Sequence, residues 1–364
     1  MKSRCWVEIS RSRIAANYRS VRDAARPAAV LGVVKADAYG HGALEVARVL
    51  CGEDTEWLAV SSVAEGVSLR RGGIAARILI MAGVMRGEHA VVEEFHLTPV
   101  LHSLDELPLF AGKVHLKLDT GMNRLGTLAS AEEIARALHA APHVHLEGLL
   151  SHFASAADFT GHQTEEQVLA FEQKLAALEA LGVRADLLHL SSTNAIAYPR
   201  TGTVQTLARP GHAIYGYVSP ARGPARPPCF SVEPALQWKT RIVAVKDLPK
   251  GAKVGYGGSH VTAAPARIAV LAAGYADGVS HRLSNKGKVI AGGKFAPIIG
   301  TVSMDLTTID ITASPGLRPG DTVTLLGREG DLSLDAQQIA RTAGTISYNV
   351  LCGISARVER VYLD

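Results

Sequence analysis

Eight short apolar runs, separated by stretches with helical periodicity, are the feature that most restricts the fold of this chain. A parallel strand covered on both faces is a nearly continuous apolar run, whereas a half-exposed strand alternates. Eight such strands with intervening helices are typical of a (β/α)8 barrel. The sequence therefore predicts an α/β fold with an N-terminal (β/α)8 TIM-type barrel. The runs are residues 29–34, 57–60, 77–82, 97–101, 114–118, 145–150, 187–190 and 206–208.

Helix signals lie between these runs. Ser130 and Glu133 have the spacing of a capping box, which predicts a helix that ends near His139. A second amphipathic stretch covers residues 164–181. Both support the alternation of strands and helices that a barrel requires.

A second, mainly β domain is predicted after a tract rich in proline and glycine at residues 220–228, which we interpret as a linker. The boundaries predicted are 8–225 for the barrel and 229–364 for the β domain, with residues 1–7 joining the latter. One helix is expected at 334–343. The strands expected here are 236–245, 267–271, 294–299, 306–311 and 322–326.

The composition excludes several classes of function. A chain of 364 residues with 47% hydrophobic and 20% charged residues can build two ordinary globular cores. The net charge is +4, and the sequence contains no run of five like charges. Neither nucleic acid nor a membrane is therefore an expected partner. No signal peptide or membrane span is found, which predicts a cytoplasmic protein. The four isolated cysteines are expected to be reduced thiols, not metal ligands.

Lys35 ends the first apolar run and precedes a loop flanked by glycines. Barrel enzymes present their chemistry at the carboxyl ends of the strands, and burial makes a lysine nucleophilic. The alternative is an exposed lysine that closes the strand. The segment VVKADAYGHG at residues 33–42 resembles the cofactor signature of the alanine racemase family. The resemblance implies that Lys35 binds pyridoxal 5'-phosphate as a Schiff base and that Tyr39 contacts its phosphate.

HLKLDTGMNRLG at residues 115–126 resembles the second signature of the same family. By that resemblance Arg124 contacts the cofactor phenolate and the substrate carboxylate, and Lys117 is a candidate for carbamylation. A buried neutral lysine can take up CO2 and become an anion that pairs with a guanidinium. A structural lysine paired with Asp119 is the alternative.

LARPGHAIYG at residues 207–216 resembles a further family segment, which implies that Arg209 faces the pyridine nitrogen. An arginine stays protonated, so it donates to this nitrogen and leaves it unprotonated, which weakens the ring as an electron sink. The resemblance also implies that the amides of Gly211 and His212 bind phosphate. His212 departs from the family, where a small aliphatic residue is expected.

Two matches in the barrel are weaker. In HLSSTNA at residues 189–195, Thr193 supplies the hydroxyl that the family directs to the phosphate, but Ser192 and Thr193 stand where Asn and Ser are usual. In LLSHFA, His152 resembles the histidine that links a catalytic tyrosine to Arg209. A core histidine bonded to the backbone is the alternative for His152.

The second domain carries the remaining resemblances. KVGYGG at residues 253–258 implies that Tyr256 is a second catalytic base, where a turn residue is the alternative. The segments GYADG, VSMD and ISYN also match, and they imply Tyr275 at the pocket entrance, Met304 and Asp305 near the substrate carboxylate, and Tyr348 near the phosphate.

The resemblance implies an alanine racemase that supplies D-alanine for peptidoglycan, as a homodimer with shared active sites. Inversion requires two acid/base groups on opposite faces of the cofactor, and Lys35 and Tyr256 are the expected pair. Tyrosine has an ordinary pKa of ~10, so Tyr256 needs a positive network such as His152 and Arg209. A serine or broad-specificity racemase remains open, and a decarboxylase or a non-catalytic carrier of the cofactor is more distant.

Overall fold

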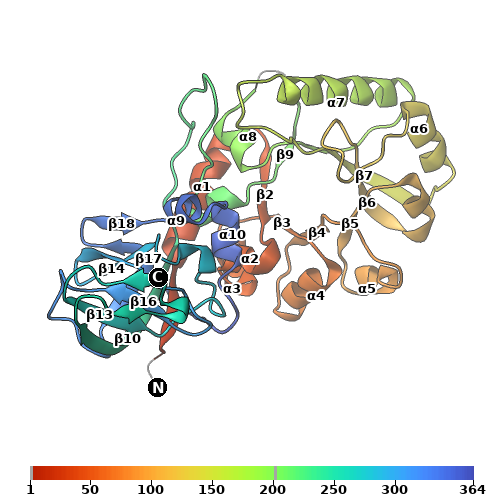
Figure 1. The fold of residues 1–364 in the computed structure, drawn as a ribbon. Helices are drawn as coiled ribbons and strands as arrows, with labels where there is room; N and C mark the ends of the chain where they lie inside the picture. Colours follow the sequence, from red (N-terminus) through yellow and green to blue (C-terminus); the bar gives the residue numbers. More distant parts are fainter. Residues whose placement is uncertain (1–2, 201–202) are drawn as a thin grey trace. The chain divides into compact units, whose positions relative to one another are not determined.

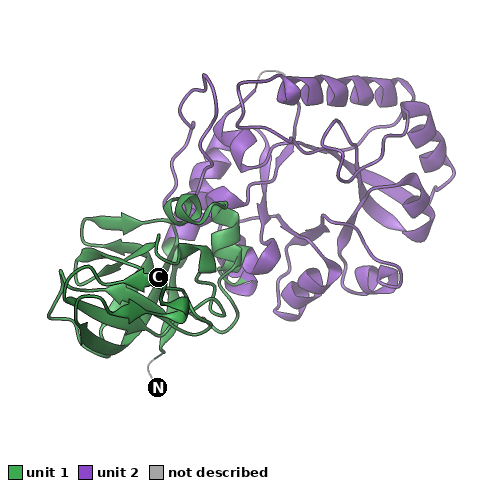
Figure 2. Ribbon diagram, in the orientation of Figure 1, with its two compact units in different colours: residues 1–12, 39–42, 234–364 green, residues 13–38, 43–233 purple. Residues whose placement is uncertain are grey.

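The computed structural model describes residues 3–200 and 203–364, which form two compact units (Figure 2). The barrel unit contains residues 13–38 and 43–233. The β unit contains the described residues up to Ser12 together with 39–42 and 234–364. Within the described ranges, no helix is both long and apolar enough to cross a membrane.

The barrel unit contains eight parallel strands, and each of the eight predicted runs forms one of them (Figure 1). Hydrogen-bonded neighbours follow the order β8-β7-β6-β5-β4-β3-β2-β9, and a parallel bridge between Ser192 and Arg209 connects the two ends. The predicted barrel fold is therefore confirmed. The strands are β2 (Ala29–Val33), β3 (Trp57–Val60), β4 (Arg77–Ile80), β5 (Thr98–Leu101), β6 (Gly112–Lys117), β7 (Val144–Leu150), β8 (Leu187–His189) and β9 (Leu207–Ala208).

Helices follow most of these strands. The predicted capping box is present, since the Ser130 side chain accepts from the Glu133 amide at the start of α6. The predicted helix at 164–181 is α7, which buries Phe171 and Leu178. The helices around the barrel strands are α1 (Arg11–Ala25), α3 (Ala43–Cys51), α4 (Val63–Arg71), α5 (His89–Glu94), η1 (Leu104–Leu109), α6 (Ala131–His139), α7 (Gln163–Ala180), α8 (Thr193–Ala197) and η2 (His212–Tyr215).

The segment after β2, predicted as a loop, is a short left-handed turn. It is α2 (Lys35–Gly40), in which φ is between +51° and +55° for four residues, from Ala36 to Tyr39. Left-handed geometry costs roughly 1–2 kcal/mol for each residue that has a Cβ. Two carboxylates brace the turn: Glu65 accepts from the Ala36 amide at 2.7 Å, and Asp37 accepts from the Ala43 amide at 2.8 Å.

The β unit is built on a nine-stranded sheet in which β10 (Leu236–Leu248) pairs with three other strands. The N-terminal strand β1 (Cys5–Ser10) pairs antiparallel with β10 and parallel with β19 (Glu359–Leu363). The predicted helix is α9 (Ala336–Ala343), and α10 (Ser347–Cys352) follows it. The other elements are β11 (Lys253–Val254), η3 (Tyr256–Gly258), β12 (His260–Val261), β13 (Ala266–Leu271), η4 (His281–Leu283), β14 (Lys288–Ala291), β15 (Lys294–Pro297), β16 (Thr307–Asp310), β17 (Thr322–Glu329) and β18 (Leu332–Leu334).

Two predicted boundaries need correction. Residues 8–12, assigned to the barrel, belong to the β unit because β1 completes its sheet. Residues 1–2 lie outside the described residues. The tract at 220–228, which we interpret as the linker, contacts the barrel unit: the Arg222 carbonyl accepts from the Phe159 amide, and the Arg222 guanidinium pairs with Asp158 at 3.1 Å. The chain passes to the β unit at residues 233–234.

Candidate active site

Five predicted site residues gather at the carboxyl ends of the barrel strands. Lys35 follows β2, Lys117 ends β6, His152 follows β7, Thr193 follows β8 and Arg209 follows β9. The electrostatics reflect this clustering. Burial, followed by the positive charges of Arg209, Lys117, Arg124 and Lys35, lowers the pKa of His152 to about 3. His152 is therefore neutral near pH 7, inside a group of cations.

Arg209 is 5% exposed and is held by acceptors on two segments, residues 151–152 after β7 and residues 189–190 at the end of β8. One terminal nitrogen donates to the Ser151 carbonyl at 2.6 Å and the Leu190 carbonyl at 3.1 Å, and lies 3.4 Å from Nδ1 of His152. The other donates to the carbonyl and to Nδ1 of His189. Burial lowers the pKa of Arg209 to about 9, so the group remains charged near neutrality. Its Nε–H has no hydrogen-bond partner among the described residues.

Lys117 is 6% exposed, and burial together with the charges of Arg124 and Arg209 lowers its pKa to about 8. The described residues provide no hydrogen bond or ion pair for its amine. Asp119 does not pair with it, because this carboxylate accepts the amides of residues 121, 122 and 123 at 3.0–3.1 Å. Among the described residues no Lys117–Asp119 ion pair is formed, although Asp119 is near enough for its charge to raise the pKa of Lys117.

The loop that carries Arg124 returns tightly to its strand. Gly126 has a φ of +115°, and a Cβ on this residue would lie 2.9 Å from the Asp119 amide nitrogen. Arg124 itself is exposed, without a hydrogen bond or ion pair among the described residues. A guanidinium in this state can bind a carboxylate through two parallel hydrogen bonds.

The segments after β8 and β9 are joined by a side chain. Oγ1 of Thr193 accepts from the amides of Gly211 and Ala213 at 3.2 and 3.1 Å. His212 is 1% exposed and stacks on Tyr217, with ring centroids 5.2 Å apart. The imidazole that departs from the family pattern thus fills the interior of the barrel unit. The phosphate contacts expected of Thr193, Gly211 and His212 stay predictions.

The β unit brings together the other predicted residues in two places. Tyr39 and Tyr348 lie with ring centroids 5.9 Å apart, and burial and then the neighbouring Tyr348 raise the pKa of Tyr39. Tyr275 and Met304 lie on loops joined by two backbone hydrogen bonds. A Cβ on Gly274 would lie 2.3 Å from the Ser303 carbonyl oxygen, so this approach requires glycine.

Two further residues of the β unit differ in their surroundings. Asp305 pairs with Arg357 at 2.7 Å, so its carboxylate is already partly neutralised. Tyr256 stands in a turn between Gly255 and Gly257, with φ of +72° and +68°, and it is 76% exposed. None of the described residues of the β unit covers this phenol.

Three buried polar residues were not predicted as part of a site. They are His115 on β6, Glu147 on β7 and His189 on β8, and each of the three residues is at most 4% exposed. Each interrupts an apolar run of a barrel strand with a group that can ionise. That interruption, repeated in three consecutive strands, is the signal that could have identified them.

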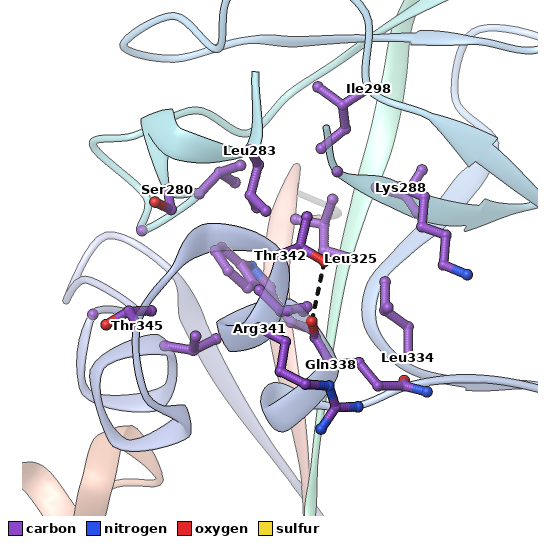
Figure 3. Close-up of a pocket in the computed structure, with 18 of the residues that line it drawn as sticks. Ser280, Leu283, Lys288, Ile298, Leu325, Leu334, Gln338, Arg341, Thr342 and Thr345 are labelled. Atoms are coloured by element: carbon purple, nitrogen blue, oxygen red, sulfur yellow. Dashed lines mark hydrogen bonds between the residues drawn. The ribbon is translucent and has the colours of Figure 1, made fainter. Parts of the chain in front are cut away.

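The β unit also contains a pocket of about 470 Å3 between its sheet and α9 (Figure 3). Its lining is mixed: Leu283, Ile298, Leu325 and Leu334 contribute aliphatic side chains, and Lys288, Gln338, Arg341 and Thr342 contribute polar or charged ones (Figure 3). Of the predicted site residues, Tyr275 alone lines it. The groups expected to bind the cofactor lie elsewhere, so we do not assign this pocket to the cofactor.

Comparisons with known proteins agree with the geometry. The profile of the alanine racemase N-terminal domain matches residues 9–220, and that of the C-terminal domain matches residues 235–362. An alanine racemase of Halothermothrix orenii is 37% identical over 98% of this chain and 96% of its own length. Another, of Syntrophobacter fumaroxidans, is 39% identical over 96% of this chain and 95% of its own.

Solved structures give the same result. The alanine racemase of Streptomyces lavendulae has a TM-score of 0.91 at 31% identity, covering 100% of this chain and 98% of that one. That of Bartonella henselae, which has covalently bound pyridoxal phosphate, has a TM-score of 0.88 at 25% identity and full coverage of both chains. With both domains matched in order along the chain, this protein belongs to the alanine racemase family.

Proposed function

We propose that this protein interconverts L- and D-alanine with pyridoxal 5'-phosphate as its cofactor. Membership of the family over the full length supports the reaction. The observation in the structure that carries the proposal is the cluster of Lys35, Lys117, Arg124 and Arg209 around a neutral His152 at the end of the barrel. Such a group of cations suits an anionic cofactor and an amino-acid carboxylate.

The donors in the barrel unit fit the cofactor. Pyridoxal phosphate offers a ring nitrogen that accepts one hydrogen bond, and Arg209, a 5% exposed residue, has an Nε–H without a hydrogen-bond partner among the described residues. Because the pKa of Arg209 stays near 9, this donor keeps its proton near neutral pH. Lys35, at the end of β2, is the residue we assign to covalent attachment. We assign the phosphate to Tyr39, Tyr348 and the turns that Thr193 joins.

The reaction needs proton transfer on two faces of the substrate. When bound, the cofactor supplies an electron sink for the electron pair left by the α-proton. We assign one face to the amine of Lys35 and the other to the phenol of Tyr256. Arg124 holds the substrate carboxylate, and Tyr275, Met304 and Asp305 limit what enters. Nδ1 of His152 faces the Arg209 guanidinium, which only donates, so the neutral ring carries its proton on Nε2 and can donate a hydrogen bond to the phenol oxygen.

Lys117 is proposed to carry a carbamate. Carbamylation requires a neutral amine, and a lysine with a pKa of about 8 has an appreciable neutral fraction at physiological pH. The carbamate would be an anion beside Arg124, whose guanidinium has no ion pair among the described residues. This modification would replace a buried positive charge by a paired negative one.

A homodimer with shared active sites is proposed for the assembly. Tyr256, Tyr275 and Met304 are 76%, 46% and 54% exposed, although aromatic and apolar side chains of a binding site are normally covered. A second copy of the chain, bound so that these residues face its barrel strands, would cover them and supply Tyr256 to the site of its partner.

The test is racemisation of a panel of amino acids. Purified protein with the cofactor is incubated with L-alanine, L-serine or L-lysine, and each D-isomer is quantified by chiral chromatography. Selective formation of D-alanine supports the proposal, equal rates on several substrates support the broad-specificity alternative, and no D-isomer from any substrate contradicts both. Lys35→Ala is the control for catalysis by free cofactor. The peptidoglycan role and the cytoplasmic location stay predictions, which rescue of a D-alanine auxotroph and cell fractionation would test.

A further inference from the structure

A row of buried side chains crosses the inside of the barrel unit from Arg209 to Glu147. Nη1 of Arg209 lies 2.9 Å from Nδ1 of His189, whose Nε2 lies 2.9 Å from Nδ1 of His115. Nε2 of His115 lies 3.4 Å from Oε2 of Glu147. Both imidazoles are fully buried, and Glu147 is 4% exposed. None of the three residues beyond Arg209 has a role in the proposed reaction.

The hydrogen bonds along this row can run in only one direction. A guanidinium only donates, so Nδ1 of His189 must accept. A neutral imidazole with an unprotonated Nδ1 carries its proton on Nε2, so His189 donates to Nδ1 of His115. By the same reasoning His115 carries its proton on Nε2 and donates to the carboxylate of Glu147. Burial, more than any other cause, lowers the pKa of both histidines, in keeping with neutral rings.

The backbone of β6 and β7 leaves space for the His115 side chain. The pairing of β6 with β7 shifts register between Val114 and His115, and a Cβ on Gly148 would lie 2.5 Å from Nδ1 of His115. The glycine therefore leaves the space that the imidazole occupies. The ring of His115 also packs against Trp57 of β3, with ring centroids 5.4 Å apart. Because β3 and β6 are not neighbours in the sheet, these rings meet inside the barrel.

Glu147 ends the row as a fixed negative charge. It pairs with Arg77 at 2.5 Å and with Lys113 at 2.8 Å. Burial alone would raise the pKa of this carboxyl, but the hydrogen bonds from His115, Arg77 and Lys113 outweigh burial and hold the pKa well below its usual range. An ionised carboxylate only accepts, so it admits a single tautomer of His115.

We propose that Glu147 is a positioning residue of the active site, which acts through His115 and His189 to hold Arg209 in place. An acceptor is fixed at one end of the row and a donor at the other, so each imidazole has one permitted tautomer. If His189 carried its proton on Nδ1, two N–H groups would face each other and the guanidinium would be displaced. The inference rests on the proposed function, because it concerns the residue assigned to the ring nitrogen of the cofactor.

The direct test is the tautomer of each histidine in the holoenzyme, measured by 15N NMR on protein labelled only at histidine. Single substitutions of His115 and His189 assign their signals. In the wild-type protein both rings should be protonated at Nε2 alone. In Glu147→Gln the amide can also donate, so a population of His115 protonated at Nδ1 should appear. A wild-type His189 protonated at Nδ1 would overturn the proposal.

Steady-state kinetics tests the consequence for Arg209. His115→Phe keeps Glu147 and its two ion pairs but breaks the row, and it should lower kcat roughly tenfold, or ~1.4 kcal/mol in the barrier. We expect the KM for alanine to stay within about twofold, because Arg209 does not bind the substrate. Glu147→Gln should act in the same direction. If neither variant lowers kcat, the row does not serve catalysis.

Arg77→Met and Lys113→Met are the matched controls, because each removes an ion pair from Glu147 and leaves the row intact. They should preserve both tautomers and kcat. If they reduce kcat as much as His115→Phe does, Glu147 acts only as a structural ion-pair partner and the proposal fails. The proposed function fails separately, if wild-type protein makes no D-amino acid whatever the tautomers are.

Discussion

Replacing Lys117 by methionine should stabilise the barrel unit, and most strongly below pH 8. The amine is 6% exposed, and burial, with the charges of Arg124 and Arg209, lowers its pKa from 10.5 to about 8. At 1.36 kcal/mol for each pKa unit, the folded protein loses about 3 kcal/mol by keeping this lysine charged. Methionine has a similar length and no charge, so Lys117→Met should recover up to that amount at pH 7.

The stabilisation by Lys117→Met should depend on pH, because the pKa of Lys117 differs between the folded and the unfolded protein. Below pH 8 the amine is protonated in both the folded and the unfolded protein, and the full penalty applies. Between pH 8 and 10.5 the folded protein has released the proton while the unfolded chain still binds it, so the stability of the wild type rises with pH. The advantage of Lys117→Met should therefore fall to about 1 kcal/mol at pH 9.5.

The assay is urea unfolding in CO2-free buffer at pH 7 and pH 9.5, followed by circular dichroism. Lys174→Met is the control, because this half-buried lysine of the same unit donates to the Ala129 carbonyl. It should show no gain at either pH. An advantage of Lys117→Met that is equal at the two pH values, or a loss at pH 7, would refute the reasoning. Bicarbonate at pH 8 should stabilise the wild type alone if Lys117 forms a carbamate.

Four further outcomes are expected. Holoprotein should have a visible absorption band that borohydride removes, and Lys35→Ala should lose that band; a reducible band in the variant would contradict the assignment. Arg209→Glu should protonate the ring nitrogen, slow racemisation and produce a persistent band at longer wavelength, whereas unchanged rates and spectrum would exclude the electronic role. Mixed subunits of Lys35→Ala and Tyr256→Phe should regain activity over the single variants, each of which should lose roughly 10²- to 10⁴-fold, unless both bases act within one chain. Ala36→Gly should raise the free energy of unfolding by about 1 kcal/mol by relieving the left-handed turn, while Ala177→Gly on the exposed face of α7 should lower it by about 0.5–1 kcal/mol.

The barrel could be predicted from the sequence because its strands are buried on both faces. Their runs are mostly apolar, and each ends at a polar segment, so even the two residues of β9 were located. The strands of the β unit were harder to predict from the sequence. β19 has the sequence ERVYL, in which charged and apolar residues mix, and its partner β1 lies at the other end of the chain. No local pattern encodes a pairing between segments so far apart.

Part of the candidate site could likewise be predicted from the sequence, and part could not. Lys35, Lys117, His152 and Arg209 follow strands, so their common location followed from the barrel topology. The left-handed turn of Ala36 to Tyr39 did not, because these residues rarely adopt a positive φ and nothing local signals it. The row from Arg209 to Glu147 was missed for a different reason. Its direction depends on which atom of each imidazole carries the proton, and only the distances between side chains determine that.

The two units alternate along the chain, and this determines which fragments proteolysis or truncation can produce. The backbone passes between the barrel unit and the β unit four times, and residues 39–42 belong to the β unit although Lys35 belongs to the barrel. There the Gly40 carbonyl accepts from Arg360, and a Cβ on Gly40 would lie 2.4 Å from the Leu351 carbonyl oxygen. A protease that nicks the tract at 220–228 therefore leaves portions of the β unit in both fragments. Neither fragment is a self-contained domain, and a barrel expressed without the C-terminal sequence would lack the contacts that fix the segment after Lys35.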